Sequence, residues 1–422
     1  MLLISYYWPP AGGGGVFRWL KMCKFLPEYG WEPTVFTPTQ KQGSIEDSTL
    51  LNQVEGINVI GIPITEPYDL YRKFMGSQKK NSSELITKNG SWKQKLALWI
   101  RGNFFIPDPK VLWVTPASKY LTEYLKNNQV DLIVSTGPPH SMHLVAMKTN
   151  RRGIPWIADF RDPWSKIDFH DKLMMTQYAK NKNMALEKKV LQNCDAIVTV
   201  TRTWKQDLEK LSGREVFLIS NGFDPDDFIE SLPKKDSKFT FTHVGSMNED
   251  RNIETTWRAI RNFIQAKQLG QQDFEIRLVG DVDQSVVKSI EKFDLSNYAV
   301  LVGPVSHQEA IQEMKLASLL YLPINQISIS NHGIVPGKFY EYLAAERPIL
   351  CIGSAESDIA ELLLKSQGTN AILPEDENGI AEFIDSVWSN RFEPQGNFAA
   401  FSRKNLAHEY VKIFNQLKNH QA

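Results

Sequence analysis

The sequence is poor in cysteine and carries no excess of either charge. Its three cysteines, Cys23, Cys194 and Cys351, lie far apart, so they form neither a disulfide framework nor a metal-ligand spacing. A reducing compartment such as the cytosol is therefore the simplest expectation. Lys plus Arg and Asp plus Glu number 48 each, and this balance argues against broad nucleic-acid binding, which needs a basic surface.

Long apolar runs are also missing. No stretch approaches the roughly 18 apolar residues that a membrane-spanning helix needs. The amino-terminal run LLISYY has no basic flank and meets two prolines at once, which favours a β-strand over a secretory signal. With 422 residues, 42% of them hydrophobic and 23% charged, the chain is expected to be a globular protein of two or three domains. Contact with a membrane surface stays open.

A dinucleotide-binding fingerprint is absent, although four glycines follow the first predicted strand. In a G-x-G-x-x-G pattern begun at Gly12 the last glycine is replaced by Phe17, and in one begun at Gly13 it is replaced by Arg18. The next strand, PTVFTP, ends without an acidic residue for a ribose, which argues against a dehydrogenase. We expect Gly13 and Gly14 to bring backbone N–H groups close to donor phosphates or to an acceptor. A purely structural turn is the alternative.

Short apolar runs alternate with amphipathic helical stretches along most of the chain. This alternation predicts parallel sheets covered by helices on both faces. The predicted strands are LLISYY, PTVFTP, INVIGIP, VDLIVSTG, PWIADF, DAIVTVT and VFLISNG in the first half, and FTFTHVG, FEIRLVG, AVLVG, LLYLP, RPILCIG and NAILP in the second. So many strands indicate two doubly wound α/β domains rather than one sheet.

The charged, proline-containing stretch 224–240 interrupts the alternation and marks the predicted domain boundary. We predict a first domain at 1–228, a second at 236–400, and a final helix at 401–422 that packs back onto the first domain. Ligands of doubly wound sheets bind beyond the carboxyl ends of the strands. Two such Rossmann-like domains would face each other across a deep cleft.

Residues 71–101 are rich in Lys and Arg, contain scattered aromatic residues, and have Glu84 as their only acid. A solvated insertion is one interpretation. The other is a surface that touches anionic lipid head groups, which would suit an acceptor carried on a lipid.

Several polar residues in the first half follow predicted strands and are candidates for the acceptor side. His140 follows VDLIVSTGPP and is a candidate catalytic residue in contact with the sugar; His143 is a weaker candidate. Asp159 is near the end of PWIADF and Arg161 follows it, and Arg18 lies in the helix after the glycine loop. The alternative for Asp159 and Arg161 is an internal ion-pair network with Asp162.

In the second half, glycines and cations follow the strands. Gly245 ends FTFTHVG and precedes Asn248 and Arg251, and an Arg at that place can bind phosphate bidentately. Gly303 ends AVLVG, ahead of a capping box formed by Ser306 and Glu309. Asp281 and Asp283 form an Asp-x-Asp pattern that some transferases use for a metal, but a helix cap is the favoured interpretation, and we predict no metal site.

The stretch GIVPGKFYEYLAAERPIL, residues 333–350, predicts a helix whose amino terminus is open to a ligand. Free N–H groups and the positive end of the helix dipole suit a phosphate, and Lys338 adds a charge at the same place. Glu341 lies one turn further on the same face and can accept hydrogen bonds from a vicinal diol. Together these features describe a nucleoside diphosphate. A simple surface pair of Lys338 with Glu341 is the alternative.

The order of the glycine loop, ADFRDPW, ISNGFD, VGSMNEDRN, VGPVSHQEAI and VPGKFYEYLAAERPIL resembles the family-4 glycosyltransferases, over nearly the whole chain. It is similar to the branch that builds bacterial surface polysaccharides. The resemblance implies a GT-B fold, retaining transfer without a metal, and a ribose held by Glu341. The family's preceding glutamate falls on Gly333, so backbone groups of Gly333, Ile334 and Val335 would have to replace it. Ser246 also stands where an Arg is common, which leaves Arg251 and Lys338 as the phosphate-binding cations.

The resulting hypothesis is transfer of a sugar from a UDP- or GDP-linked donor to a saccharide or lipid-linked acceptor. Arg251, Lys338 and the helix terminus would stabilise the departing diphosphate. No other cofactor is expected. Two rival interpretations stay open. One is an epimerase or hydrolase of nucleotide sugars, and the other is a non-catalytic subunit that binds them, which the missing glutamate at Gly333 slightly favours.

Overall fold

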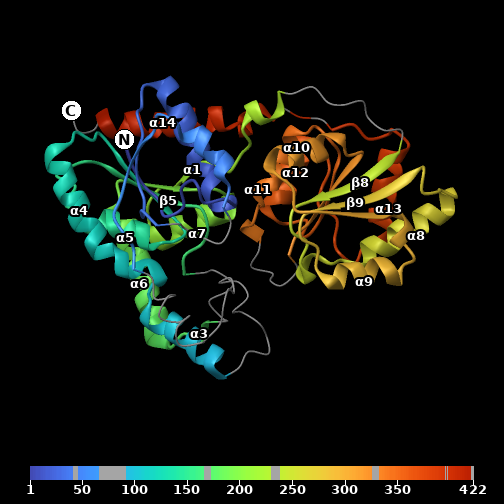
Figure 1. Cartoon of the computed structure of the whole chain (residues 1–422), viewed down its shortest axis with the longest axis horizontal. Helices are drawn as coiled ribbons and strands as arrows, with labels where there is room; N and C mark the ends of the chain where they lie inside the picture. The colour runs from blue at the N-terminus through green and yellow to red at the C-terminus, as the bar shows by residue number, and fades with distance from the viewer. Residues whose placement is uncertain are drawn as a thin grey trace. The chain divides into compact units, whose positions relative to one another are not determined.

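The computed structural model describes residues 1–40, 46–65, 92–165, 173–229, 238–325, 332–394, 396 and 398–419. It divides into two compact units. Unit 1 contains Met1–Ser220 and Leu406–Ala422, and unit 2 contains Asn221–Asn405. Each unit is built on one sheet with helices on its faces (Figure 1). The predicted α/β architecture with two Rossmann-like domains is confirmed.

Unit 1 has a sheet of seven parallel strands in the order β3-β2-β1-β4-β5-β6-β7. Its strands are β1 (Leu2–Ile4), β2 (Thr34–Phe36), β3 (Asn58–Ile60), β4 (Ile133–Gly137), β5 (Trp156–Phe160), β6 (Ala196–Thr199) and β7 (Phe217–Leu218). Successive residues point to opposite faces: Leu2 and Ile4 belong to one hydrophobic cluster and Leu3 to another. Because both faces are covered, the strands appear in the sequence as continuous apolar runs.

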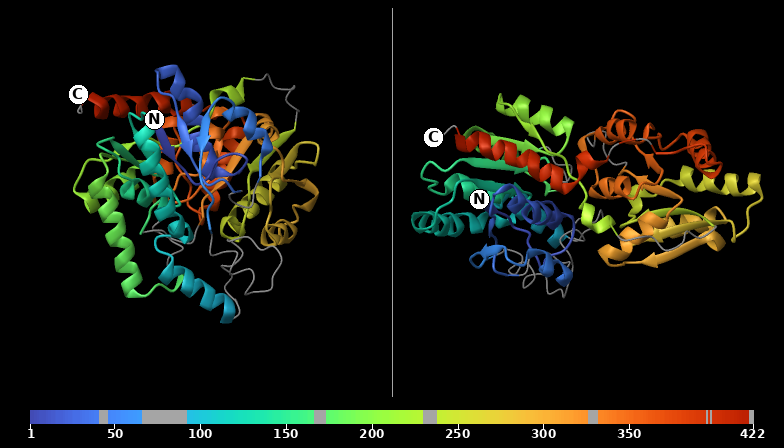
Figure 2. Two further views of the ribbon diagram at one scale, coloured as in Figure 1. Left: turned by 60° about the vertical axis from the view of Figure 1, so that its left-hand side comes forward. Right: turned by 90° about the horizontal axis from the view of Figure 1, so that it is seen from above.

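Helices cover both faces of this sheet. Those of unit 1 are α1 (Gly14–Phe25), α3 (Trp92–Phe104), α4 (Val114–Asn127), α5 (Ser141–Lys148), α6 (Gln177–Asn193), α7 (Arg202–Ser212) and the greater part of α14 (Arg403–Asn419). One face packs against α4 and α5, and the other against α1 and α14. The right-hand view of Figure 2 shows α14, in red, lying along the sheet of unit 1.

Unit 2 has a sheet of five parallel strands in the order β10-β9-β8-β11-β12. The strands are β8 (Phe239–Val244), β9 (Phe274–Val279), β10 (Ala299–Gly303), β11 (Leu319–Pro323) and β12 (Ile349–Ile352). The helices are α8 (Glu254–Lys267), α9 (Gln284–Lys292), α10 (His307–Leu316), α11 (Gly337–Ala344), α12 (Asp358–Gln367) and α13 (Glu377–Trp388). Helices α8, α9 and α13 pack on one face, and α10, α11 and α12 on the other.

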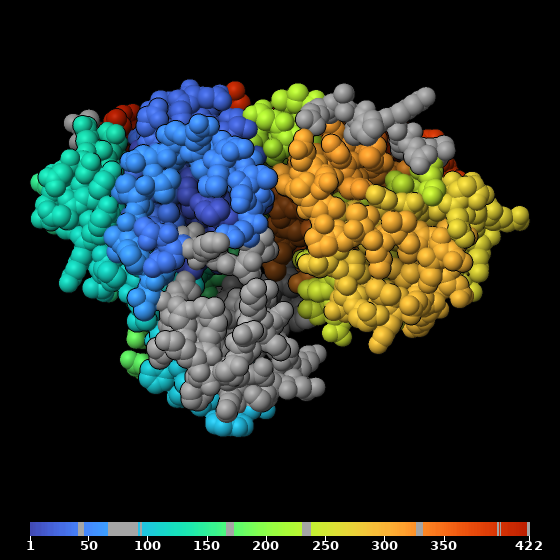
Figure 3. Space-filling view, in the orientation of Figure 1, coloured from blue at the N-terminus to red at the C-terminus, as the bar shows by residue number. Residues whose placement is uncertain are grey.

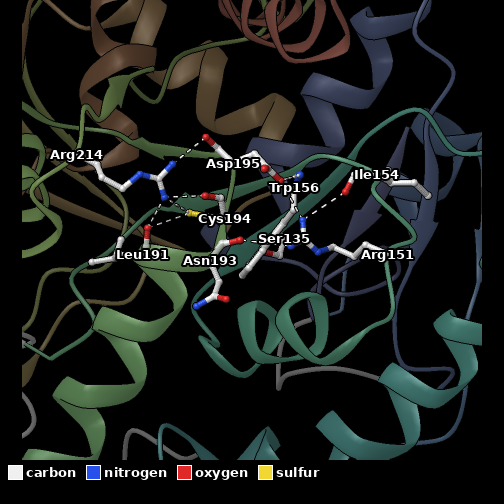
Figure 4. A network of polar contacts seen from close by, with 9 residues as sticks. All are labelled: Ser135, Arg151, Ile154, Trp156, Leu191, Asn193, Cys194, Asp195 and Arg214. Atoms are coloured by element: carbon white, nitrogen blue, oxygen red, sulfur yellow. Dashed lines mark hydrogen bonds and ion pairs between the residues drawn. The ribbon is translucent and has the colours of Figure 1, made fainter. Parts of the chain in front are cut away.

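Two arginines join the loops at the amino-terminal ends of β5 and β6 (Figure 4). Arg151 donates to the Ile154 carbonyl and to the Asp195 carboxylate, and Asp195 also accepts from the backbone N–H of Trp156. Arg214 donates to the carbonyls of Leu191, Cys194 and Asp195. These contacts stabilise the edge of the sheet that lies opposite the strands' carboxyl ends.

Two expectations need correction or qualification. The predicted strand NAILP is wrong, because Ile372 forms only an isolated bridge with Ile352 and no ladder follows. Of the basic stretch 71–101, residues 71–91 lie outside the described part of the chain, and the remainder belongs to α3. None of the described helices has the length and hydropathy needed to cross a bilayer.

Candidate functional site

Each sheet reverses its winding at one place, β1/β4 in unit 1 and β8/β11 in unit 2. This place is the topological switch point of the sheet. The loops after its two strands diverge there, and doubly wound sheets bind ligands between them. Most of the residues predicted from the sequence follow these four strands.

In unit 2, Lys338 lies directly over Gly245. A Cβ atom built on Gly245 would come within 2.4 Å of the Lys338 Nζ, and the φ of Gly245 is +117°. Glycine is therefore needed at this position for two reasons, the left-handed backbone and the close approach of the ammonium group. The structure thus brings together two predicted residues that are far apart in sequence.

His243, near the carboxyl end of β8, is a hydrogen-bond partner of that lysine. Its Nδ1 lies 3.0 Å from the Tyr321 carbonyl, so Nδ1 carries the proton and donates. The Nε2 then accepts from the Lys338 Nζ at 3.5 Å. Burial and the nearby Lys338 lower the pKa of His243 to about 3, so the imidazole is neutral.

The position of Lys338 is set by α11, which begins at Gly337. Its apolar face is buried through Phe339 and Leu343, and the hydroxyl of Tyr342 accepts a 2.8 Å hydrogen bond from the Val244 N–H. That bond holds α11 against the residue before Gly245. The amino terminus of α11, with its free N–H groups, consequently lies beside the end of β8.

Arg251 bridges the switch point of unit 2. Its Nε donates to the Asn325 Oδ1, after β11, and its Nη1 donates to the Ser246 carbonyl, after β8, both at 2.8 Å. Its Nη2 has no hydrogen-bond partner among the described residues. Arg251 closes the short helical turn Glu249–Arg251, whose N-cap is Asn248.

The two cations repel each other, and neither forms an ion pair with a described residue. Burial, and then Arg251, lower the pKa of Lys338 to about 7. Burial also lowers the pKa of Arg251. Within the part of the chain described, Lys338 and Glu341 form no ion pair, so the alternative of a simple surface pair is not what the structure has. An uncompensated positive site of this kind is suited to an anion.

Three strand-end glycines lie in a row at this edge. The Gly245 N–H donates to the Val279 carbonyl, and the Gly280 N–H donates to the Gly303 carbonyl. A Cβ on Gly280 would come within 2.7 Å of the Gly245 carbonyl oxygen. After Gly303, the predicted capping box of Ser306 and Glu309 is present.

Asp281 and Asp283 follow Gly280 in the sequence. The Asp283 carboxylate accepts from the Ser285 N–H and caps α9, which confirms the favoured interpretation for that residue. The backbone of Asp281 contributes a carbonyl that accepts from the Met247 N–H. The pair therefore helps to shape the loops beside Gly245.

Glu341 lies one turn into α11, half-buried, and its carboxylate makes no hydrogen bond within the described chain. Burial raises its pKa, while His307 and Lys338 are among the groups that oppose the rise. His307 starts α10, so this carboxylate faces the loop that follows Gly303. A half-buried carboxylate without a hydrogen-bond donor in the described chain is suited to accept from a ligand's hydroxyls.

The short segment before α11 contains the other predicted donor contacts. Gly333 and Val335 are buried, and Val335 packs into the core beside α11. Ile334 is half-buried. Their backbone groups remain predicted donor contacts.

In unit 1, Arg161 bridges the equivalent switch point. Its Nη1 donates to the Gly15 carbonyl, after β1, at 2.7 Å, and its Nη2 donates to the Pro138 carbonyl, after β4, at 2.6 Å. The residue holds the glycine loop against the loop that carries His140. Gly13, with φ of 89°, is the N-cap of α1, and Gly14 is exposed at its first turn.

His140 is 7% exposed, and its ring stacks on Trp164 with centroids 4.9 Å apart. His143 stacks on Phe160, and burial lowers its pKa to about 3. A Cβ on Gly137 would touch both imidazoles, at 2.7 and 2.8 Å. Because the His140 ring is so largely covered here, its contact with a sugar remains a prediction.

Arg18 and Asp159 form a buried ion pair at 3.1 Å, with side chains 1% and 0% exposed. Arg18 also donates to the carbonyls of Ile219 and Ser220, and Asp159 accepts from Tyr410 of α14. An internal ion pair is the alternative that the sequence offers for Asp159, and the structure has one, although its partner is Arg18. An acceptor saccharide has no access to either side chain, so we assign both a structural role.

Known proteins share this organisation. Residues 79–227 match the model of Glycosyltransferase Family 4. Sucrose-phosphate synthase from Thermosynechococcus elongatus is similar over 99% of this chain and 98% of that chain, with a TM-score of 0.61 and 16% identity. An α,α-trehalose-phosphate synthase (UDP-forming) from Burkholderia xenovorans, solved with glucose-6-phosphate, gives 0.57 over 99% of each chain at 12% identity.

A TarM variant from S. aureus, solved with UDP, gives a TM-score of 0.55 over 98% of this chain and 99% of that chain, at 10% identity. The chain has the GT-B fold. The Family 4 match agrees with the resemblance seen in the sequence over residues 79–227, about a third of the chain. No curated protein is significantly similar to this sequence.

Three residues at the switch point of unit 2 were not predicted from the sequence: His243, Gly280 and Tyr342. Gly280 carries the same signal as Gly245, a glycine directly after an apolar strand. His243 and Tyr342 carry no such signal, because a histidine in a strand and a tyrosine in a helix look like core residues. Only their contacts with Lys338 and Val244 show their role.

Gly245→Ala is expected to weaken binding of a nucleoside diphosphate by about tenfold or more, since the new methyl group displaces the Lys338 ammonium and a charge-assisted hydrogen bond is worth about 1.5–3 kcal/mol. Titration calorimetry measures the change. Gly368→Ala is the matched control, because Gly368 also has a positive φ, +70°, but nothing lies near its Cβ position. Equal affinities in the two variants would contradict the placement of Lys338.

Proposed function

We propose that the protein is a retaining glycosyltransferase. It moves a sugar, of hexosyl type, from a UDP- or GDP-linked donor to a saccharide or lipid-linked acceptor in polysaccharide or glycoconjugate biosynthesis. Unit 2 binds the donor, and the loops at the switch point of unit 1 serve the acceptor side. The Family 4 match supports the class of reaction.

The observation that carries this proposal is the pair of unneutralised cations at the switch point of unit 2. Lys338 reaches over Gly245 from the first turn of α11, and Arg251 spans the loops after β8 and β11. A diphosphate supplies the missing negative charge. Glu341, one turn along α11, accepts from the ribose hydroxyls.

The same groups account for the chemistry. As the bond between sugar and diphosphate breaks, negative charge grows on the phosphate oxygens, and Lys338, Arg251 and the helix terminus stabilise it. Stabilisation of developing charge by fixed groups is commonly the largest catalytic term. If the acceptor hydroxyl attacks the face that the diphosphate leaves, the departing phosphate takes its proton. Retention then needs neither a protein nucleophile nor a metal.

A panel of UDP-, GDP- and dTDP-sugars, incubated with saccharide and lipid-linked acceptors with and without EDTA, tests the proposal. We expect one nucleotide class to be consumed with formation of an α- or β-product of unchanged anomeric configuration, and EDTA to have no effect. Strict dependence on Mn²⁺ would contradict it. Donors that stay intact while a nucleotide raises the melting temperature would favour a non-catalytic binding subunit, the rival suggested by Gly333.

Binding of the nucleotide is expected to weaken at alkaline pH. The free protein has a Lys338 pKa of about 7, lowered by burial and by Arg251, and a bound diphosphate raises it. Above pH 7 the free lysine therefore loses the proton that the complex keeps, so the dissociation constant rises by up to about tenfold per pH unit. Calorimetry between pH 7.5 and 9, where the diphosphate is fully ionised, should show uptake of one proton.

Lys338→Met is the control for this pH dependence. The variant should bind weakly with little change across the same window, because it has lost the titrating group. A wild-type slope retained in Lys338→Met would assign the proton to another residue.

Cytoplasmic location and contact with a membrane surface, both expected from the sequence, are proposals as well.

A further inference from the structure

An apolar stripe lies on the exposed side of α3 in unit 1. Its members recur at helical spacing: Trp92, Leu96, Trp99, Ile100 and Phe104. Each is more than a third exposed, and Trp92 and Phe104 reach 67% and 66%. A helix at the surface of a globular protein ordinarily turns such a stripe toward the core. Here the stripe faces outward, which marks an interaction site.

The opposite side of α3 is fixed to the segment that leads into α6. A Cβ on Gly102 would come within 2.6 Å of the Leu173 carbonyl oxygen, so the two backbones nearly touch. The Asn103 Oδ1 accepts from both the N–H and the hydroxyl of Thr176 at 2.7 Å. The stripe is therefore held outward by specific contacts. Figures 1 and 3 show α3, in cyan, at the lower edge of unit 1.

The adjoining part of α6 extends the apolar surface and adds charge. Met174 and Tyr178, just before and within α6, are 43% and 75% exposed. Four exposed lysines follow on α6: Lys180, Lys182, Lys188 and Lys189. None of the four forms an ion pair within the part of the chain that is described. The single acid of α6, Glu187, is buried.

Basic residues outnumber acidic ones on α3 and α6. Helix α3 adds Lys95 and Arg101 and has no acidic residue in its sequence, whereas the whole chain has equal numbers of basic and acidic residues. Exposed aromatic residues within a basic surface are typical of helices that lie in the head-group region of a bilayer. A second copy of this chain would present the same positive charge and be repelled.

We propose that α3 and α6 form a docking surface for an anionic lipid bilayer. The apolar stripe of α3 enters the head-group region, and the lysines of α6 lie against the lipid phosphates. This surface belongs to unit 1 and does not include Lys338 or Arg251. The proposal is independent of glycosyl transfer, and it places the unit at the membrane where a lipid-linked acceptor would be found.

Flotation of the full chain with vesicles tests the proposal. We expect binding to vesicles of phosphatidylcholine with 30% phosphatidylglycerol, a fall when salt is raised from 0.1 to 0.5 M, and weak binding to pure phosphatidylcholine. Trp92→Ser with Phe104→Ser should lower the partition coefficient at least tenfold. Lys180→Glu with Lys188→Glu should lower it by about fivefold per lysine. Brominated lipids should quench tryptophan fluorescence in the wild type and less in Trp92→Ser.

Two matched variants in other places control for surface and charge. Leu364→Ser removes an apolar side chain that is 57% exposed on α12. Lys365→Glu with Lys412→Glu changes net charge as much as the α6 variant does. Both should bind vesicles as the wild type does, and all variants should keep its melting temperature within a few degrees. Absence of vesicle binding, equal binding by the α3 variant, or conversion of a dimer to a monomer by that variant would each overturn the proposal.

Discussion

Lys338→Ala is expected to lower kcat for sugar transfer by about a hundredfold or more. The lysine supplies a positive charge where the leaving diphosphate becomes negative, and loss of one such group typically costs at least this much. Its Nζ is held over Gly245 by the position of α11. Steady-state rates with saturating donor measure the effect on kcat separately from weaker binding.

Lys365→Ala is the control for this experiment. Lys365 belongs to the same unit, is exposed on α12 and pairs with Glu361 one turn away. Its replacement should leave kcat within about twofold, because exposed pairs contribute little. A Lys338→Ala enzyme that transfers sugar at the wild-type rate would show that leaving-group stabilisation lies elsewhere.

Arg18→Met is expected to lower the free energy of unfolding of unit 1 by about 3–5 kcal/mol, since removal of one partner of a buried ion pair leaves the other charge uncompensated. Burial alone would raise the pKa of Asp159, but Arg18 and hydrogen bonds from Trp19 and Tyr410 outweigh it and hold the pKa below its ordinary value. The contribution of Asp159 to stability is thus complete above about pH 4 and is lost as pH falls below that.

Denaturant unfolding at pH 7, followed by circular dichroism, measures the loss. Lys126→Ala is the comparison, because Lys126 pairs with Glu123 on the exposed surface of α4 and its removal should cost less than about 0.5 kcal/mol. The same experiment distinguishes a structural role from an acceptor contact. A stable Arg18→Met protein with impaired transfer would restore the acceptor-side interpretation.

The fold was predictable because the central strands of both sheets are buried on both faces. Every strand of both sheets lies within a predicted apolar run, since Leu2, Leu3 and Ile4, for example, must all be apolar to serve two cores. NAILP has the same composition, yet it fails because the chain meets the sheet edge at Ile372 for one bridge only. Composition shows that a segment is apolar and does not show where the sheet ends.

The candidate site could be predicted only for residues whose place after a strand, or at the start of a helix, can be read from the sequence. Gly245, Arg251, Lys338 and Glu341 follow strands or open a helix, and those positions can be read along the chain. Arg18 and Asp159 have the same appearance, but they are 141 positions apart and neutralise each other. His243 was missed for the converse reason, because its role depends on a lysine 95 positions away.

A crystal structure with bound UDP or GDP tests the central claim most directly. The account predicts diphosphate oxygens within hydrogen-bond distance of the backbone N–H groups at the start of α11, the Lys338 Nζ and the Arg251 guanidinium, with the ribose hydroxyls on Glu341. A nucleotide bound at another place, with the amino terminus of α11 in contact with solvent alone, would contradict it.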